Sequence, residues 1–213
     1  MIKIKLLGVY NIKYAILGMQ NHIYSWHLTD SSELGQAGNR KLEEKYQNLA
    51  KRLIIAGPDN CRFLRFITVC FDLIAPLYWW REFDTYKFKE TNSSPTMHKL
   101  NSKYLTPHEF SFDYLKDNKS AHILNHNTLS TAYNPQEIKK EENNESQKAI
   151  FRKHTQNFPN TYIQKRTVIT NYAELRNIYF QHRKHKLDEW GEFYDWIKET
   201  LPYAEDLICL EKS

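Results

Sequence analysis

The chain has 213 residues, 41% of them hydrophobic and 14% aromatic, and it carries a formal net charge of +5. This size and composition suit one globular domain spanning residues 1–213, and the mildly basic balance fits a phosphate-bearing ligand. Only six glycines are present, which excludes the glycine-rich phosphate loops of Walker and Rossmann proteins.

The distribution of cysteines and apolar residues indicates a reduced, cytoplasmic protein. Three widely spaced cysteines form no CxxC pair, which argues against a disulfide scaffold or a zinc ribbon. Lysines interrupt the N-terminal stretch, so it makes a poor signal peptide. Arg65, Asp72 and Pro76 break the most apolar run, so we expect no membrane-spanning helix.

The N-terminal part of the chain predicts a strand followed by helices. Residues 2–10 are expected to form a strand, and residues 14–19 a short helix or a second strand. Residues 40–56 carry apolar side chains at helical spacing, and Gly57-Pro58 should stop this helix.

Residues 61–99 are the most informative stretch. Alternate residues over 63–73 are apolar except Arg65, and the other face also carries apolar side chains, so the stretch predicts a strand with both faces at least partly covered. Pro76 suits the first turn of the following helix, because no N–H donor is needed there. Four aromatic residues then share one helical face: Trp79, Trp80, Phe83 and Tyr86. The helix should end near Lys87, before a polar loop at residues 91–96.

The second half of the chain contains one charged stretch between structured elements. Thr106-Pro107-x-Glu109 resembles a helix start. Residues 134–148 are charged and of low complexity, which indicates a mobile loop or a solvated helix. Residues 161–168 fit a strand or an extended entry into the last helix. Together these elements predict an α+β fold, with a small mixed β-sheet packed with several helices.

Residues 171–201 predict a long final helix. Asn171 is a good N-cap, and Glu174, three residues later, completes a pattern like a capping box. An apolar stripe runs along the helix, and Pro202 closes it. The basic stretch 181–186 interrupts this stripe, so it either meets solvent or binds an anion.

We identify no catalytic residue, and no metal site is predicted. His122 and His126 have the spacing of two ligands on one helical face, but the sequence around them offers no third ligand. Cys70 lies inside the predicted strand and fits a buried structural thiol better than a nucleophile. Arg81 is either a solvated helix charge or a fork that binds a phosphate or a carboxylate.

Several segments together resemble the flavin-dependent thymidylate synthases, also called thymidylate synthase-complementing proteins. In that family a strand leads into a helix ending in Arg-His-Arg, and a serine-bearing loop follows. A downstream helix begins Asn-x-Arg-x-Leu-x-Asn and has a further Arg five residues on. Residues 56–83 resemble the strand and helix, residues 91–99 the loop, and residues 171–190 the downstream helix.

The resemblance implies functions for the residues at matching positions. Arg81 stands at the first Arg of Arg-His-Arg, and Asn171 and Asn177 stand at the two Asn positions. The implied cofactor-binding residues are therefore Asn171, Asn177 and Arg81. The implied substrate-binding residues form a second set: Arg81, Ser94, His182 and Arg183.

The family pattern is incomplete in this chain. Glu82 and Phe83 replace its His and second Arg, and Ala173 replaces an Arg that contacts flavin. Glu82 would repel an anionic flavin or phosphate. These departures keep open a catalytically degenerate member that acts as a nucleotide-binding or assembly module.

A complete member of the family would be a homotetramer with sites built from several chains. The resemblance implies that FAD is the cofactor and that dUMP is methylated to dTMP, with NADPH as reductant and methylenetetrahydrofolate as carbon donor. A nucleic-acid-binding protein is the third hypothesis, although the modest net charge argues against it. Its cations would be Arg176, Arg183, Lys184 and Lys186.

Overall fold

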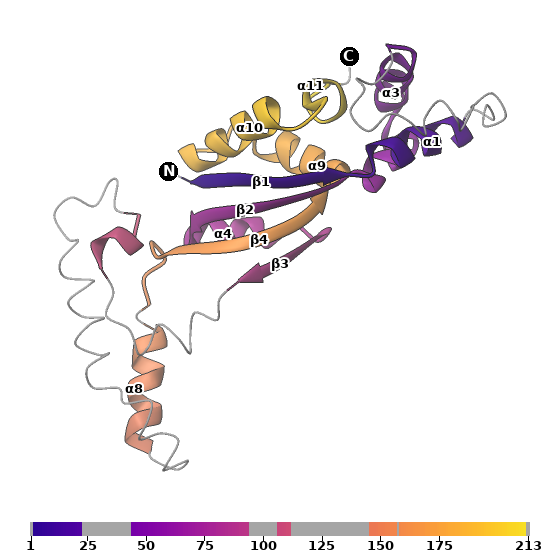
Figure 1. Ribbon diagram of the computed structural model, residues 1–213. Coiled ribbons are helices and arrows are strands. Elements are labelled where there is room, and N and C mark those ends of the chain that lie inside the picture. Colours follow the sequence, from indigo (N-terminus) through magenta and orange to yellow (C-terminus); the bar gives the residue numbers. More distant parts are fainter. Residues whose placement is uncertain (1, 23–43, 94–105, 112–144, 157, 212–213) are drawn as a thin grey trace. The chain divides into compact units, whose positions relative to one another are not determined.

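The computed structural model describes residues 2–22, 44–93, 106–111, 145–156 and 158–211 (Figure 1). Four strands form one sheet in the order β1-β2-β4-β3. Their bounds are β1 Lys3–Tyr10, β2 Thr68–Pro76, β3 Lys89–Ser93 and β4 Ile163–Asn171. With helices before, between and after these strands, the α+β fold class is confirmed.

The chain divides into two compact units. The first comprises Met1–Leu73, Thr85–Asn92 and Thr167–Ser213, and the second comprises Ile74–Asp84 and Ser93–Arg166. Strands β2, β3 and β4 each contain a boundary between the units. That residues 1–213 form one domain stays a prediction.

The first unit holds most of the described helices. They are α1 Ile12–His22, α3 Glu44–Ala56, the 3-10 helix η2 Pro58–Phe66, α9 Tyr172–His182, α10 Asp188–Thr200 and α11 Ala204–Leu207. The predicted strand at residues 2–10 is confirmed as β1, and residues 14–19 are helical. None of the described helices is long and apolar enough to cross a lipid bilayer.

Strand β2 alternates as the sequence predicts, and α10 packs against it. Val69, Phe71 and Leu73 are fully buried. The Phe71 ring lies 4.9 Å from the Trp196 ring and 6.2 Å from that of Phe193, both on α10. Burial of these aromatic side chains supplies a large hydrophobic stabilisation of the first unit.

The prediction that this strand begins at residue 63 is wrong. Residues 58–66 form η2 instead, and β2 begins at Thr68. Gly57 adopts a φ of 122°, which favours glycine, and it turns the chain from α3 into η2. Phe63 and Leu64 are both buried and Arg65 is exposed, a sequence of burial that fits a helix and contradicts alternation.

The predicted long helix at residues 171–201 is two helices. Helix α9 ends at His182 and α10 begins at Asp188, so most of the basic stretch lies between them. The His182 ring stacks on the Trp190 ring, with 4.3 Å between the centroids and 6° between the planes. This contact links the end of α9 to the start of α10.

The second unit contains α4 Leu77–Phe83, the 3-10 helix η3 Pro107–Glu109 and α8 Glu145–Gln156. Thr106 and Glu109 form the capping box that the sequence predicts. Within the charged stretch 134–148, residues 145–148 belong to α8, and residues 134–144 lie outside the described residues.

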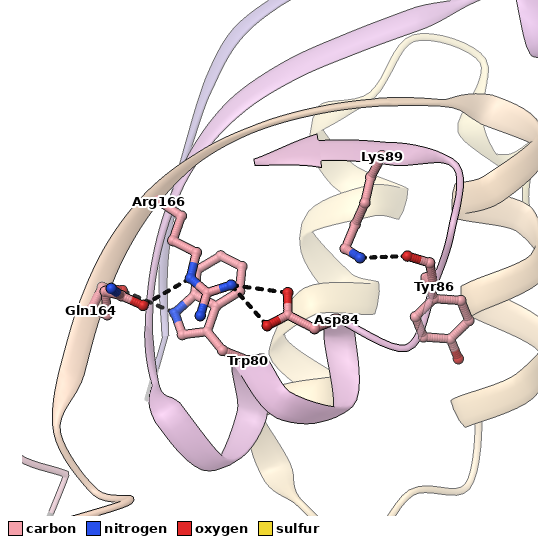
Figure 2. A network of polar contacts seen from close by, with 6 residues as sticks. All are labelled: Trp80, Asp84, Tyr86, Lys89, Gln164 and Arg166. Atoms are coloured by element: carbon pink, nitrogen blue, oxygen red, sulfur yellow. Dashed lines mark hydrogen bonds and ion pairs between the residues drawn. The ribbon is translucent and has the colours of Figure 1, made fainter. Parts of the chain in front are cut away.

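Helix α4 carries the predicted aromatic face but ends at Phe83, earlier than expected. Phe83 is fully buried and stacks on Trp79, with 4.9 Å between the ring centroids. Arg166 on β4 fixes the end of the helix (Figure 2). Its guanidinium lies 4.4 Å over the Trp80 ring and donates at 2.9 Å to both carboxylate oxygens of Asp84. Asp84 is the C-cap residue that follows Phe83 at the end of α4.

Candidate functional site

The first unit encloses a cavity of about 750 Å³ beside α9. Its walls come from the end of α3, from η2, from the residue before β3, from α9 and from the C-terminal segment. The lining residues are Ile54, Pro58, Cys61, Leu64, Arg65, Phe88, Asn171, Ala173, Glu174, Arg176, Asn177, Phe180, Arg183 and Glu211. This volume falls within the usual range for small-molecule and cofactor sites, about 300–1,000 Å³.

Asn171 lies where β4 ends and α9 begins. Its side-chain Oδ1 accepts a hydrogen bond of 3.0 Å from the backbone N–H of Glu174, which confirms the predicted N-cap. The cap occupies the carbonyl of the Asn171 amide. Its NH₂ group is therefore the part that can donate to a ligand.

Glu174 places a buried carboxyl group in the cavity wall. Burial raises the pKa of this carboxyl, and Lys89, the Asn177 amide and the backbone N–H of Phe88 act in the opposite direction. On the next turn of α9, Asn177 Oδ1 accepts a 2.9 Å hydrogen bond from Gln181 Nε2. The Asn177 amide thus links Gln181 to Glu174 and holds both side chains in place.

Three arginines bring positive charge to the same cavity. Arg176 is half-buried, donates to the carbonyl oxygen of Ile208 at 2.7 Å, and lies 4.6 Å over the Phe180 ring. Burial lowers the pKa of Arg176. Arg183 forms an ion pair with Glu211, and Arg65 is exposed on the last turn of η2.

The cavity brings together only part of the predicted site. Asn171, Asn177 and Arg183 line it. His182 does not; it stacks on Trp190, and its ring lies 5.6 Å from that of Tyr86. Arg81 is exposed on α4 in the second unit, and Ser94 lies outside the described residues.

Other cavity residues were missed or misassigned by sequence reasoning. Positions 173, 176, 177, 180 and 183 recur at helical spacing, so this polar and aromatic stripe on α9 could have been found. Arg176 was considered only as a nucleic-acid contact. Arg65 was assigned to a strand, and no local pattern links Phe88 or Glu211 to a site on α9.

Two of the solved structures that share this fold come from Helicobacter pylori. One is a crystal structure of thymidylate synthase X with FAD and dUMP, with a TM-score of 0.71, 12% sequence identity, and coverage of 98% of this chain and 97% of that chain. The other is the flavin-dependent thymidylate synthase X complexed with FAD and dUMP, with a TM-score of 0.70, 12% identity, and coverage of 98% and 100%.

At this level of identity the likeness establishes the fold alone. No protein-family model matches the chain, and no curated protein matches it. The comparison therefore supports the fold that the sequence resemblance implied and does not assign the chain to the family.

The positively charged residues of the cavity differ from those that the sequence resemblance implies. Phe83, which the sequence resemblance aligns with an arginine of the resembling family, is fully buried in the aromatic cluster of α4. Ala173, which the resemblance aligns with another arginine, lines the cavity without a polar side chain. The positive charge at the cavity comes from Arg65, Arg176 and Arg183 instead.

Proposed function

We propose that the cavity beside α9 binds nucleotides and that the protein acts as a flavin-dependent thymidylate synthase-like enzyme. FAD would be the cofactor, and dUMP the substrate converted to dTMP. One observation carries the proposal: Asn171, Asn177 and Arg183 line a single cavity in a chain whose fold matches enzymes solved with FAD and dUMP.

The residues present fit a cofactor of this chemistry. The exposed rings of Phe88 and Phe180 offer surfaces on which a flat heterocycle can stack. Three guanidinium groups face two carboxyl groups, those of Glu174 and Glu211, so the lining has an excess of positive charge. Phosphate groups are favoured in such surroundings because guanidinium forms charge-assisted, bidentate hydrogen bonds to them.

The proposed roles follow from which donors are available. The NH₂ groups of Asn171 and Asn177 would hydrogen-bond the flavin ring, and the arginines would bind phosphate oxygens. Arg81, Ser94, His182 and Arg183 stay proposed as the dUMP-binding set that the family resemblance implies. Bound FAD would supply the redox chemistry, with NADPH as reductant and methylenetetrahydrofolate as the carbon source.

Assembly and compartment belong to the same proposal. We expect a homotetramer in which several chains contribute to each site, and we expect it to act in the cytoplasm. The large exposed side chains of Leu7, Tyr10 and Tyr14 give the first unit apolar surface that subunit contacts could cover.

A catalytically degenerate member is the second candidate function. The burial of Phe83 favours the degenerate member, because a buried phenylalanine supplies no positive charge where the resembling family has an arginine. Each lost charge-assisted contact costs roughly 1.5–3 kcal/mol of binding energy. Two such losses would weaken cofactor binding by about 10²- to 10⁴-fold.

Titration of the purified protein with FAD tests the proposal. We expect protein that is colourless as purified and a saturating change in flavin absorbance or fluorescence at micromolar to millimolar FAD. Asn177→Ala should abolish the response, and dTMP should form from dUMP in the presence of the reductant and carbon donor. No response at millimolar FAD, together with no rise in melting temperature on adding dUMP, would remove the enzyme hypothesis.

A further inference from the structure

The cavity contains a positive charge, that of Arg176, for which the described residues supply no acidic counter-ion. Arg176 contacts the Ile208 carbonyl and the face of Phe180, both of them uncharged. Among the residues that the structure describes, no carboxylate pairs with it. A half-buried guanidinium without a carboxylate has lost hydration that nothing in the described chain fully replaces.

The two acidic residues of the cavity are both engaged elsewhere. The Glu174 carboxyl interacts with the Asn177 amide, the Phe88 backbone N–H and Lys89. Glu211 pairs with Arg183. Neither cavity carboxyl group therefore competes with an incoming anion for Arg176.

Arg176 is also held ready for binding. Only one of its five N–H donors is needed for the 2.7 Å bond to the Ile208 carbonyl, and the Phe180 ring supports the guanidinium plane. Fixing the plane before binding lowers the entropy cost of a bidentate contact. Arg65 lines the same cavity from η2 and adds a second charge that no described acidic residue pairs with.

We propose that Arg176, assisted by Arg65, anchors the phosphate or pyrophosphate group of the nucleotide that the cavity binds. The inference rests on the proposed function, in which this cavity is the nucleotide site, and it adds Arg176 and Arg65 to the residues proposed to contact the nucleotide. Positive charge lost from the hallmark positions on α4 and at Ala173 is replaced from η2 and the middle of α9.

Calorimetric titration of the full-length protein with inorganic pyrophosphate tests this anchor. Arg176→Gln should weaken pyrophosphate binding by about 10- to 100-fold, the loss expected for one charge-assisted contact. Arg62→Gln is the matched control, because Arg62 lies on η2 like Arg65, is 72% exposed and does not line the cavity. It should bind pyrophosphate as the wild-type protein does.

A second variant covers the case in which Arg176→Gln fails to fold. Arg65→Gln changes an exposed residue, so the chain should fold, and its pyrophosphate affinity should fall clearly below that of Arg62→Gln. Equal affinities of Arg65→Gln and Arg62→Gln would then overturn the proposal. So would a wild-type protein that binds no pyrophosphate.

Parallel titrations with FAD and dUMP separate the two proposals. If the wild-type protein binds FAD and dUMP and a folded Arg176→Gln variant binds both equally well, the anchor is wrong and the proposed function stands. If pyrophosphate binding depends on Arg176 while FAD and dUMP both fail to bind, the anchor stands and the proposed function is wrong.

Discussion

Asn171 combines a structural contact with a place in the cavity wall. The bond from the Glu174 backbone N–H to Asn171 Oδ1 satisfies one of the unpaired donors at the start of α9. Because Glu174 also lines the cavity, the start of the helix and the site depend on the same few atoms. Changes at this position should therefore affect both stability and binding.

Asn171→Ala should lower the free energy of unfolding by about 1 kcal/mol, the usual effect of losing an N-cap. Asn171→Asp keeps the acceptor oxygen and should retain most of that stability, while it removes the NH₂ group proposed to contact the flavin. Urea denaturation of the three proteins checks the effect. An unchanged unfolding midpoint for Asn171→Ala would show that the cap contributes nothing.

Glu174 predicts a pH-dependent stability. Burial raises its folded-state pKa above the ordinary value of 4.5, so the folded protein favours the protonated carboxyl. This contribution is complete below the ordinary pKa and is lost as pH rises through the folded-state value. Glu174→Gln cannot ionise, so its stability relative to wild type should increase between pH 4 and pH 7.

Melting temperatures of wild type and Glu174→Gln across that pH range provide the measurement. Glu199→Gln, an exposed change on α10, controls for the removal of one carboxyl group. A difference between Glu174→Gln and wild type that stays constant with pH would mean that burial does not raise the pKa of Glu174.

Among the helices, α4 contributes mainly to the core, whereas α9 contributes to both the core and the cavity. Helix α4 buries Trp79, Trp80 and Phe83 completely, so its seven residues serve mainly the core of the second unit. Helix α9 buries Leu175 and Ile178, and presents a second stripe to the cavity. Helix α4, whose sequence resembles the family's Arg-His-Arg helix, is thus mainly a packing element in this chain.

Phe83→Arg introduces the arginine that the resembling family has at the aligned position. It should destabilise the protein by at least roughly 3 kcal/mol, because it removes a buried ring and introduces an unpaired charge. The Phe83 side chain is fully buried and stacks on Trp79 at 4.9 Å, so the guanidinium would have to displace the cluster. Guanidinium chloride denaturation measures the loss, with the apolar Phe83→Leu as control. A variant as stable as Phe83→Leu would mean that the position opens easily to solvent.

The whole molecule combines the thymidylate synthase X fold with few of the family's hallmark residues. The likeness covers 98% of the chain, so it concerns the entire arrangement of elements rather than one motif. Exposed apolar residues on β1 and α1 form a surface that contacts between subunits could bury. Assembly is therefore the property of the whole molecule that most directly tests the proposed function.

Light scattering at micromolar concentration should give a mass near four times the chain mass of 25.6 kDa. Sites built from several chains require such an assembly, because one chain alone would leave them incomplete. A mass of one chain would contradict the homotetramer and would favour the degenerate module.

Local patterns in the sequence were sufficient for several elements. The strand β1, the alternation in β2, the aromatic face of α4 and the N-cap at Asn171 were all predicted, and the structure confirms them. Each depends on residues within one or two turns or strand repeats of each other. The spacing of side chains along the sequence is sufficient to predict such short-range interactions.

Only the tertiary structure decided where α9 ends, how residues 58–66 fold, and which arginines line the cavity. The sequence pattern over residues 63–73 fits a strand, yet packing against α1, α3 and α9 makes its first part helical. The cavity joins residues from Ile54 to Glu211, and sequence spacing carries no information about contacts across such distances. Asn171 could be found from its neighbours, whereas Arg176 gains its significance only from Ile208, Phe180 and the absence of a described acidic partner.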